Sequence, residues 1–166
     1  MFARSFLLRV FYLYLRAKEA KKRKEMHMYT IKAEASFDSA HFLKGYQGKC
    51  SNLHGHRWRV VVEVQSENLK EDEQNRGMVF DFGDLKSLLK DMCDHLDHSF
   101  IYEKGTLKEK TIEALMEEDF RLIPVAFRPT AENFSKYFYE EIKKKGYDVR
   151  RVEVYETPNN CASYEE

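Results

Sequence analysis

Apolar and polar residues alternate over residues 29–38, with apolar side chains at every second position from Tyr29 to Phe37. A period of two predicts a β-strand with one buried face. A loop with two glycines follows, and the β-branched stretch at residues 57–66 (RWRVVVEVQS) predicts a second strand. We expect these two strands to pair in an antiparallel manner.

A helical period replaces the alternation after the polar loop at residues 67–77. Asp81 is suited to the N-cap position, and apolar residues from Leu85 to Leu96 recur at spacings of three and four. This pattern predicts an amphipathic helix. Residues 106–119 predict a second, weaker helix.

The remainder of the chain predicts a strand, a helix and a strand in turn. Pro124 lies in the short strand pattern at residues 121–127 and would confine that strand to a sheet edge. Pro129 and Thr130 open a helix that Gly146 ends, and residues 151–157 (RVEVYET) alternate as a closing strand. The order β-β-α-(α)-β-α-β predicts an α+β fold with antiparallel pairing.

Length and composition bound the class of protein. The 166 residues fit one domain, and an apolar fraction of 43% is enough for a sizeable core. The three cysteines are odd in number and widely spaced, so we expect no disulfide scaffold. Free thiols are typical of a reducing compartment, which predicts a cytoplasmic location.

Charge divides the chain into two unlike parts. Residues 1–27 carry eight Lys and Arg and two Glu, a net charge of +6, whereas the rest carries 20 basic and 26 acidic residues, a net of −6. The mildly acidic body gives no reason to expect nucleic acid as a partner. The apolar run at residues 6–15 is shorter than the roughly 20 residues of a membrane-spanning helix, so no membrane partner is expected.

The stretch KKRKE before Met26 has the composition of a translated purine-rich leader. We therefore expect residues 1–27 to be a basic N-terminal extension, with translation starting at Met26 or Met28. Residues 28–166 are expected to form a single catalytic domain. A mitochondrial presequence, which is Arg-rich and amphipathic, is a second interpretation of the extension.

Three histidines form the strongest chemical signal. His54 and His56 are two apart, so on an extended chain both imidazoles project from one face. His41 ends the preceding strand, and a hairpin would bring it beside them. Three neutral imidazoles are a recurrent zinc set that leaves the fourth position open. An HxH pair alone is equally typical of a surface strand, but three of the six histidines gather here beside Cys50, which favours zinc.

Cys50 leaves two interpretations open at this point. It is either a free thiol that takes part in chemistry or the fourth ligand of a closed, structural zinc site. Spacing alone does not distinguish the two. Cys93 falls on the apolar face of the first predicted helix, where we expect it in the core, and Cys161 carries no assignment.

Asp97 and His98 end the apolar helix and form a weaker signal. Asp97 could fix the tautomer of His98 or of a neighbouring histidine. Taken alone, however, such a pair is more typical of a helix C terminus, where the dipole favours a cation.

Two carboxylates complete the candidate residues. Glu132 is one position early for a capping box, because Asn133 holds that place, so it either complements the helix N terminus or contacts a ligand. Glu156, followed by Thr157, ends the closing strand, and its two acceptor oxygens suit a ring nitrogen beside an exocyclic amine. Taken alone, both acids are more typical of a helix start and a strand end.

In this order, these segments resemble the 6-pyruvoyltetrahydropterin synthase / 6-carboxytetrahydropterin synthase family. The resemblance covers nearly all of residues 28–166 and rests on FDSAHFL, CSNLHGH, GMVFDFGDLK, LDHSF, PTAEN and VYETPNN. It implies a tunnelling fold, an α+β architecture in which each subunit has a four-stranded antiparallel sheet with helices packed on one face. It also implies that trimers close these sheets into a barrel and that two trimers stack as a homo-hexamer, with active sites between subunits.

The resemblance assigns roles by position. The Zn²⁺ ligands would be His41, His54 and His56. Catalysis would fall to Cys50 as the base and to a proton-transfer pair from a neighbouring subunit, Asp97 and His98. The pterin substrate would be anchored by Glu156, with supporting contacts from Thr130, Glu132 and Thr157.

The implied enzyme is a lyase that converts 7,8-dihydroneopterin triphosphate to 6-carboxy-5,6,7,8-tetrahydropterin in queuosine (7-deazaguanine) biosynthesis, with release of acetaldehyde and triphosphate. The alternative is the pyruvoyl branch, which eliminates triphosphate without breaking a carbon–carbon bond. The compact body and the leader favour the carboxy branch, whereas the catalytic residues do not decide. Relatives in folate synthesis carry Glu at the catalytic position, so Cys50 counts against that branch. A different class of hypothesis is that the protein is a non-catalytic zinc-binding module, with Cys50 as the fourth ligand.

Overall fold

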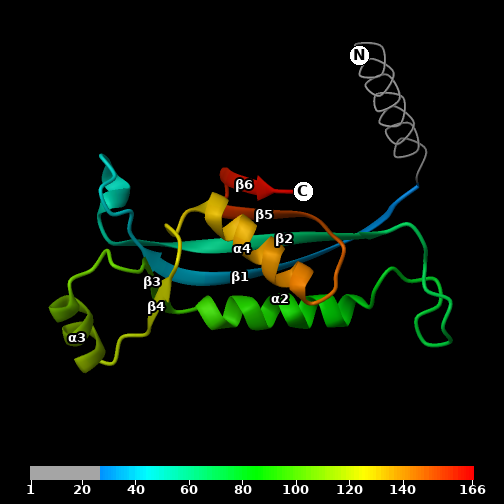
Figure 1. Ribbon diagram of the computed structural model, residues 1–166, viewed down its shortest axis with the longest axis horizontal. Helices are drawn as coiled ribbons and strands as arrows, with labels where there is room; N and C mark the ends of the chain where they lie inside the picture. Colours follow the sequence, from blue (N-terminus) through cyan, green and yellow to red (C-terminus); the bar gives the residue numbers. More distant parts are fainter. Residues whose placement is uncertain (1–26) are drawn as a thin grey trace, which may run out of the picture.

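The computed structural model describes residues 27–166 and contains one mixed six-stranded sheet with the order β4-β3-β1-β2-β5-β6 (Figure 1). The strands are β1 (Tyr29–His41), β2 (His54–Ser66), β3 (Ser99–Glu103), β4 (Leu122–Val125), β5 (Val149–Thr157) and β6 (Asn160–Tyr164). The helices are α2 (Phe82–Leu96), α3 (Glu109–Glu117) and α4 (Ala131–Lys144), with a 3₁₀ turn, η1 (Lys49–Ser51). The predictions for the N-terminal extension fall on residues 1–26, which lie outside the described residues.

The long hairpin β1–β2 confirms the first two predicted strands and their antiparallel pairing. Its register runs without interruption from Tyr29 opposite Ser66 to His41 opposite His54. The apolar members of both alternations turn to the same face, where Phe37 and Trp58 are buried and stack with ring centroids 6.0 Å apart. The pairing therefore carries the histidines of both strands to one end of the hairpin.

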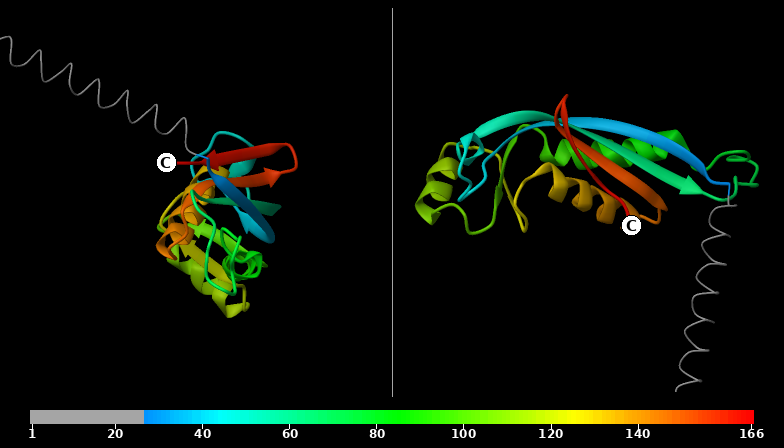
Figure 2. Two further views of the ribbon diagram at one scale, coloured as in Figure 1. Left: turned by 90° about the vertical axis from the view of Figure 1, so that its right-hand side faces the viewer. Right: turned by 90° about the horizontal axis from the view of Figure 1, so that it is seen from above.

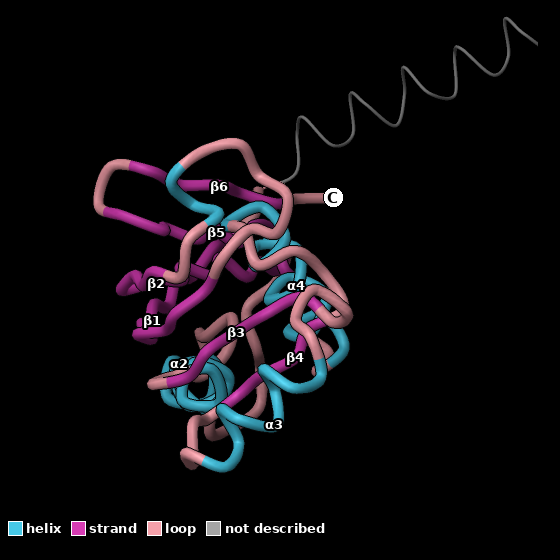
Figure 3. Tube along the Cα trace, turned by 90° about the vertical axis from the view of Figure 1, so that its left-hand side faces the viewer, coloured by secondary structure: helices cyan, strands magenta, loops and turns pink. Residues whose placement is uncertain are grey.

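The two long helices cover one face of the sheet. α2 packs against β1, and α4 packs against β5 and β6. Figure 2 shows the long strands bending around this layer, and Figure 3, seen end on, shows both helices on the same side of β1, β2, β5 and β6. The prediction of an α+β fold with helices on one face is confirmed.

The prediction of a four-stranded antiparallel sheet is wrong, because the sheet has six strands and mixed pairing. β3 pairs parallel with β1 through Ser39 and Ala40, and β4 pairs parallel with β3. These strands of five and four residues are too short to display an alternation, and α3 lies in the crossover between the parallel strands β3 and β4. The predicted edge position of the strand with Pro124 is confirmed, whereas β6 was missed.

Helix boundaries follow the capping residues. The Asp81 carboxylate accepts a hydrogen bond from the Gly83 amide at the start of α2, and Thr130 caps α4 by accepting from the Asn133 amide. Gly146, just beyond α4, has a φ of +89°, a left-handed conformation that glycine adopts without strain. Within the described residues, no helix is long and apolar enough to cross a membrane.

Candidate metal and catalytic site

Three histidines meet at the end of the β1–β2 hairpin. His41 lies directly opposite His54, and His56 lies two residues further along the same face of β2. Ring centroids are 4.4 Å apart for His41 and His54, 5.1 Å for His41 and His56, and 4.9 Å for His54 and His56. The buried indole of Trp58 underlies the cluster, 5.0 Å from His41 and 5.5 Å from His56.

Gly55 lets the two strands approach at this point. A Cβ atom there would lie 3.2 Å from the Ser39 carbonyl oxygen, which is closer than ordinary van der Waals contact. Close packing of the two strands therefore explains the glycine between the two β2 histidines.

Hydrogen bonds to carbonyl groups fix the tautomers of His41 and His54. Nδ1 of His41 lies 2.8 Å from the Pro129 carbonyl oxygen, and Nδ1 of His54 lies 2.8 Å from the Asn52 carbonyl oxygen. A carbonyl only accepts, so each Nδ1 carries the proton and each Nε2 is left as an acceptor. The Nε2 atoms of all three histidines are buried without a hydrogen-bond partner, and one ligand atom from each lies within 4.8 Å of the others.

This cluster fits a metal ion. Buried acceptor atoms without partners are costly, and a cation between them removes that cost. Burial lowers the pKa of His41 to about 4 and, more moderately, lowers that of His56, so both imidazoles are neutral at pH 7. Neutral imidazoles held by outer hydrogen bonds to carbonyl groups are the usual form of metal-ligating histidines.

Glu156 reaches the cluster from the end of β5. Its Oε1 atom lies 3.7 Å from Nε2 of His41 and 3.7 Å from Nε2 of His56. These contacts are too long for hydrogen bonds, and they bring a carboxylate group beside two of the three cluster nitrogens. The predicted substrate anchor thus lies next to the predicted metal ligands.

Cys50 lies in the turn η1 and lines a cavity of about 310 Å³. Three other predicted residues line the same cavity: Thr130, Glu132 and Glu156. Glu156 therefore connects the thiol cavity to the histidine cluster. Thr157 lines a neighbouring cavity together with His56 and Glu156.

Asp97 and His98 form a hydrogen-bonded pair. Oδ2 of Asp97 lies 2.6 Å from Nδ1 of His98, while Oδ1 accepts a hydrogen bond of 2.7 Å from the Asp38 amide. That amide, more than any other group, lowers the pKa of the Asp97 carboxyl. The ionised carboxylate consequently holds the proton of His98 on Nδ1 and leaves Nε2 free.

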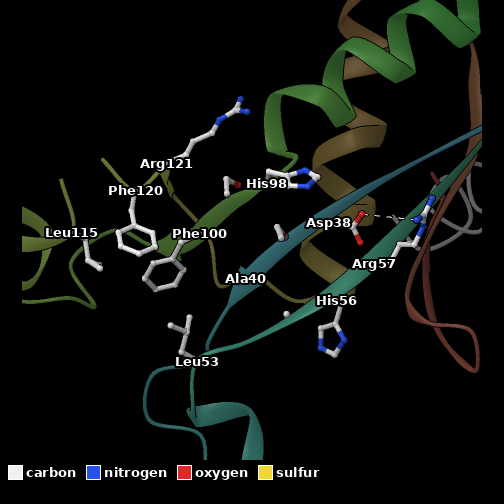
Figure 4. Close-up of a pocket in the computed structure, with 13 residues that line it drawn as sticks. Asp38, Ala40, Leu53, His56, Arg57, His98, Phe100, Leu115, Phe120 and Arg121 are labelled. Carbon is white, nitrogen blue, oxygen red and sulfur yellow. Dashed lines mark ion pairs between the residues drawn. The ribbon is translucent and has the colours of Figure 1, made fainter. Parts of the chain in front are cut away.

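The pair and the thiol lie in different cavities of the chain. His98 lines a cavity of about 680 Å³ that Cys50 does not line, although His56 does. In Figure 4 the side chains of His98 and His56 lie on opposite sides of the strands β1 and β2. One chain brings together the histidines, Glu156 and the Cys50 cavity, and it places Asp97 and His98 elsewhere.

Several lining residues were not predicted. Arg57 lines both cavities beside His56, and Arg59 lines one of them, although alternation on β2 made both equally compatible with a solvated face. Cys161 lines the cavity of Cys50 because the unpredicted β6 turns back along β5. Arg121 lines the cavity of His98 from a segment whose sequence carries no catalytic motif.

Comparison with known proteins identifies relatives of this chain. The family model described as 6-pyruvoyl tetrahydropterin synthase matches residues 30–166. A protein of Haemophilus influenzae named 6-carboxy-5,6,7,8-tetrahydropterin synthase is 37% identical over 142 residues, which cover 84% of this chain and 100% of that protein. A protein of Synechocystis with the same name is 32% identical over 139 residues, covering 82% of this chain and 93% of the relative.

Solved structures share the fold. An uncharacterised protein from Wolinella succinogenes superposes with a TM-score of 0.69 at 24% identity, covering 84% of this chain and 99% of that one. A 6-pyruvoyltetrahydropterin synthase from Plasmodium vivax superposes with a TM-score of 0.64 at 20% identity, covering 84% and 98%. At these identities the likeness establishes the architecture alone.

Proposed function

This chain belongs to the 6-pyruvoyl tetrahydropterin synthase family, and from that membership we propose that it is a zinc-dependent 6-carboxy-5,6,7,8-tetrahydropterin synthase. Its substrate would be 7,8-dihydroneopterin triphosphate, and its products would be the carboxypterin, acetaldehyde and triphosphate. The enzyme would be a lyase of queuosine biosynthesis in the cytoplasm, the compartment that three free cysteines favour.

One observation carries the proposal. Three unpartnered imidazole nitrogens, a carboxylate 3.7 Å from two of them and the cavity of a free cysteine lie side by side at one end of the sheet. The proposed chemistry requires three components. These are a metal ion that activates the oxygen-rich side chain of the substrate, a group that binds the pterin ring, and a base. The family model matches residues 30–166, which include all of these residues, and the relatives named for the carboxypterin product cover 84% and 82% of the chain.

His41, His54 and His56 would hold the metal ion through their Nε2 atoms. Bound there, Zn²⁺ would act as a Lewis acid toward the hydroxyl oxygens of the substrate side chain and lower the cost of the negative charge that develops beside them. Glu156 would accept hydrogen bonds from the ring nitrogen and exocyclic amine of the pterin. Thr130, Glu132 and Thr157 would support that contact.

Cys50 would remove a carbon-bound proton as a thiolate, which is the reactive form of the side chain. His98 would return or shuttle protons through Nε2, because Asp97 keeps the other ring nitrogen protonated. A thiol that instead closed the metal site as a fourth ligand would not be free to act as this base.

The separation of the two cavities supports an oligomer. His98 and Cys50 line different cavities of one chain, and in the proposed oligomer a second copy would present its Asp97–His98 pair to the thiol of the first. We propose a homo-hexamer built as a dimer of trimers. Sedimentation or mass photometry of the full chain measures this directly, and a monomeric active enzyme would contradict it.

Product analysis tests the proposed function. The full chain, loaded with zinc, is incubated with 7,8-dihydroneopterin triphosphate, and the products are identified by mass spectrometry. Acetaldehyde together with carboxytetrahydropterin is the expected result. Pyruvoyltetrahydropterin without acetaldehyde would move the chain to the pyruvoyl branch. If the protein holds one zinc per chain and shows no turnover, the chain would be a zinc-stabilised binding module and not an enzyme.

A further inference from the structure

The turn that carries Asp97 and His98 has an unusual backbone. α2 ends at Leu96, Asp97 is extended, and His98 has a φ of +48°. This left-handed conformation is unfavourable for a residue with a Cβ atom and persists only where neighbouring groups enforce it. The pair therefore depends on contacts that hold the end of α2 in place.

β1 holds one side of this turn. The His98 amide donates to the Asp38 carbonyl oxygen at 2.7 Å, and the Asp38 amide donates to Oδ1 of Asp97 at 2.7 Å. These reciprocal bonds fix the turn laterally against the strand. The last carbonyl groups of α2 have no hydrogen-bond partner within the helix, so they need donors from another part of the chain.

Arg121, which lies between α3 and β4, donates hydrogen bonds to these carbonyl groups. Its Nη2 donates to the carbonyl oxygens of His95 at 2.8 Å and Asp94 at 3.4 Å, and its Nη1 donates to that of Asp97 at 3.1 Å. A planar guanidinium can direct two nitrogens at several acceptors at once, which a lysine ammonium on its flexible stem cannot reproduce. The positive charge also complements the negative end of the helix dipole.

The backbone of Arg121 is fixed by the same region. Its carbonyl oxygen accepts a 2.8 Å hydrogen bond from the Phe100 amide, two residues beyond His98, at the point where β3 and β4 pair. Figure 4 shows the Arg121 side chain reaching toward the end of α2 on the side of β1 where His98 lies. The residue thus contacts both the end of α2 and the strand that leaves the turn.

We infer that Arg121 is a positioning residue, which clamps the C terminus of α2 so that the Asp97–His98 pair keeps the orientation needed for proton transfer. The inference rests on the proposed function for its catalytic meaning and on the hydrogen bonds alone for its structural meaning. Arg121 needs no contact with substrate in this role. Its loss should lower kcat and leave KM nearly unchanged.

The test compares Arg121→Gln and Arg121→Lys with Arg76→Gln, a matched loss of charge at an exposed arginine in the loop between β2 and α2. Hydrogen exchange is followed by mass spectrometry in peptides covering residues 94–100, and ¹⁵N NMR reports the imidazole tautomer of His98. In R121Q we expect at least about tenfold faster exchange at His98 and loss of the pure Nδ1–H tautomer. In R76Q both signals should match the wild type.

Kinetics of the same variants complete the test. R121Q should lose at least about tenfold in kcat with KM changed less than about twofold, and R121K should recover part of the loss. A raised KM with wild-type exchange would overturn the inference and make Arg121 a substrate contact. Unchanged exchange and tautomer in R121Q would overturn it as well. If R121Q fails to fold, R121K decides by the same exchange and NMR readouts.

The two proposals fail in distinguishable ways. An inactive wild-type enzyme would remove the proposed function, while exchange and NMR would still decide whether Arg121 holds the pair. An active wild-type enzyme with an R121Q variant that behaves like R76Q would remove only the positioning role.

Discussion

Nδ1 of His41 lies 2.8 Å from the carbonyl oxygen of Pro129, a residue 88 positions later in the chain. This contact joins the end of β1 to the loop before α4, and it decides which nitrogen of a fully buried imidazole stays free. The free Nε2 faces His54 and His56 rather than the protein interior. The loop that leads into α4 therefore supports the candidate metal site, although it contributes none of the three histidines.

Removal of one histidine should abolish tight metal binding. We expect His54→Gln to lower zinc affinity by more than the roughly 10–100-fold that loss of an outer hydrogen-bond partner costs, because a ligand itself is lost. Competition with a chromogenic chelator measures the affinity. His95→Gln, an exposed histidine on α2, is the control and should bind zinc like the wild type. Equal affinities for both variants would exclude the three-histidine site.

Replacement of the thiol separates catalysis from metal binding. Cys50→Ala should reduce turnover by roughly 10²–10⁴-fold, the range for loss of a general base, while one zinc per chain is retained. Turnover and metal content of the same preparation give the answer. Lys49→Ala, at the preceding exposed residue of η1, should stay close to the wild type. Loss of zinc and fold together in C50A would instead identify Cys50 as a structural ligand.

Asp97→Asn changes one hydrogen bond and keeps the other. The amide oxygen can still accept from the Asp38 backbone, but the amide nitrogen would face Nδ1 of His98 as a donor. The imidazole should then switch tautomer, and we expect turnover to fall by about 10²-fold or more with little change in melting temperature. Asp94→Asn, on the exposed side of α2, is the matched control. Wild-type turnover in D97N would show that the tautomer of His98 is irrelevant.

The stability of the metal-free protein should depend on pH below neutrality. Burial lowers the pKa of His41 to about 4, whereas an unfolded histidine has a pKa near 6.5. As the pH falls from about 6.5 to 4, the unfolded state takes up a proton that the native state does not, so stability is lost in this window by up to about 3 kcal/mol. Above pH 6.5 the contribution is fully present.

Urea unfolding at pH 7 and at pH 4.5, in the presence of a chelator, measures this dependence. His41→Asn removes the titrating group, so its free energy of unfolding should change less between the two pH values than that of the wild type. An identical pH dependence in both proteins would assign the effect to other groups.

Phe134 of α4 ties the helix layer to the site. Its ring is fully buried and packs against Phe37, Trp58 and Phe127 with centroids 5.8, 5.0 and 5.5 Å away. Phe134→Ala should destabilise the protein by about 3–5 kcal/mol, since it removes buried surface and leaves a cavity beneath Trp58. Chemical unfolding of F134A measures the loss. The exposed Phe82→Ala should stay within about 0.5 kcal/mol of the wild type.

The sequence by itself determined the local elements and the candidate residues for chemistry. The alternation from Tyr29 and the β-branched stretch at residues 57–66 are properties of single strands. The caps Asp81 and Thr130 act within a few residues of their own helices. The three histidines followed from strand geometry, because a spacing of two places His54 and His56 on one face. A hairpin between the two strands was enough to add His41.

Tertiary structure decided everything that depends on distant pairing. The short strands β3, β4 and β6 have too few residues to show a period of two in hydrophobicity. Their places in the sheet depend on the connections that precede them, which include α2, α3 and the turn after β5. Likewise, only the folded chain brings Pro129 to His41, Glu156 to the histidines and Arg121 to the end of α2. Hydrogen bonds between residues so far apart in sequence leave no local pattern, because their geometry is set by packing of the whole sheet and its helices.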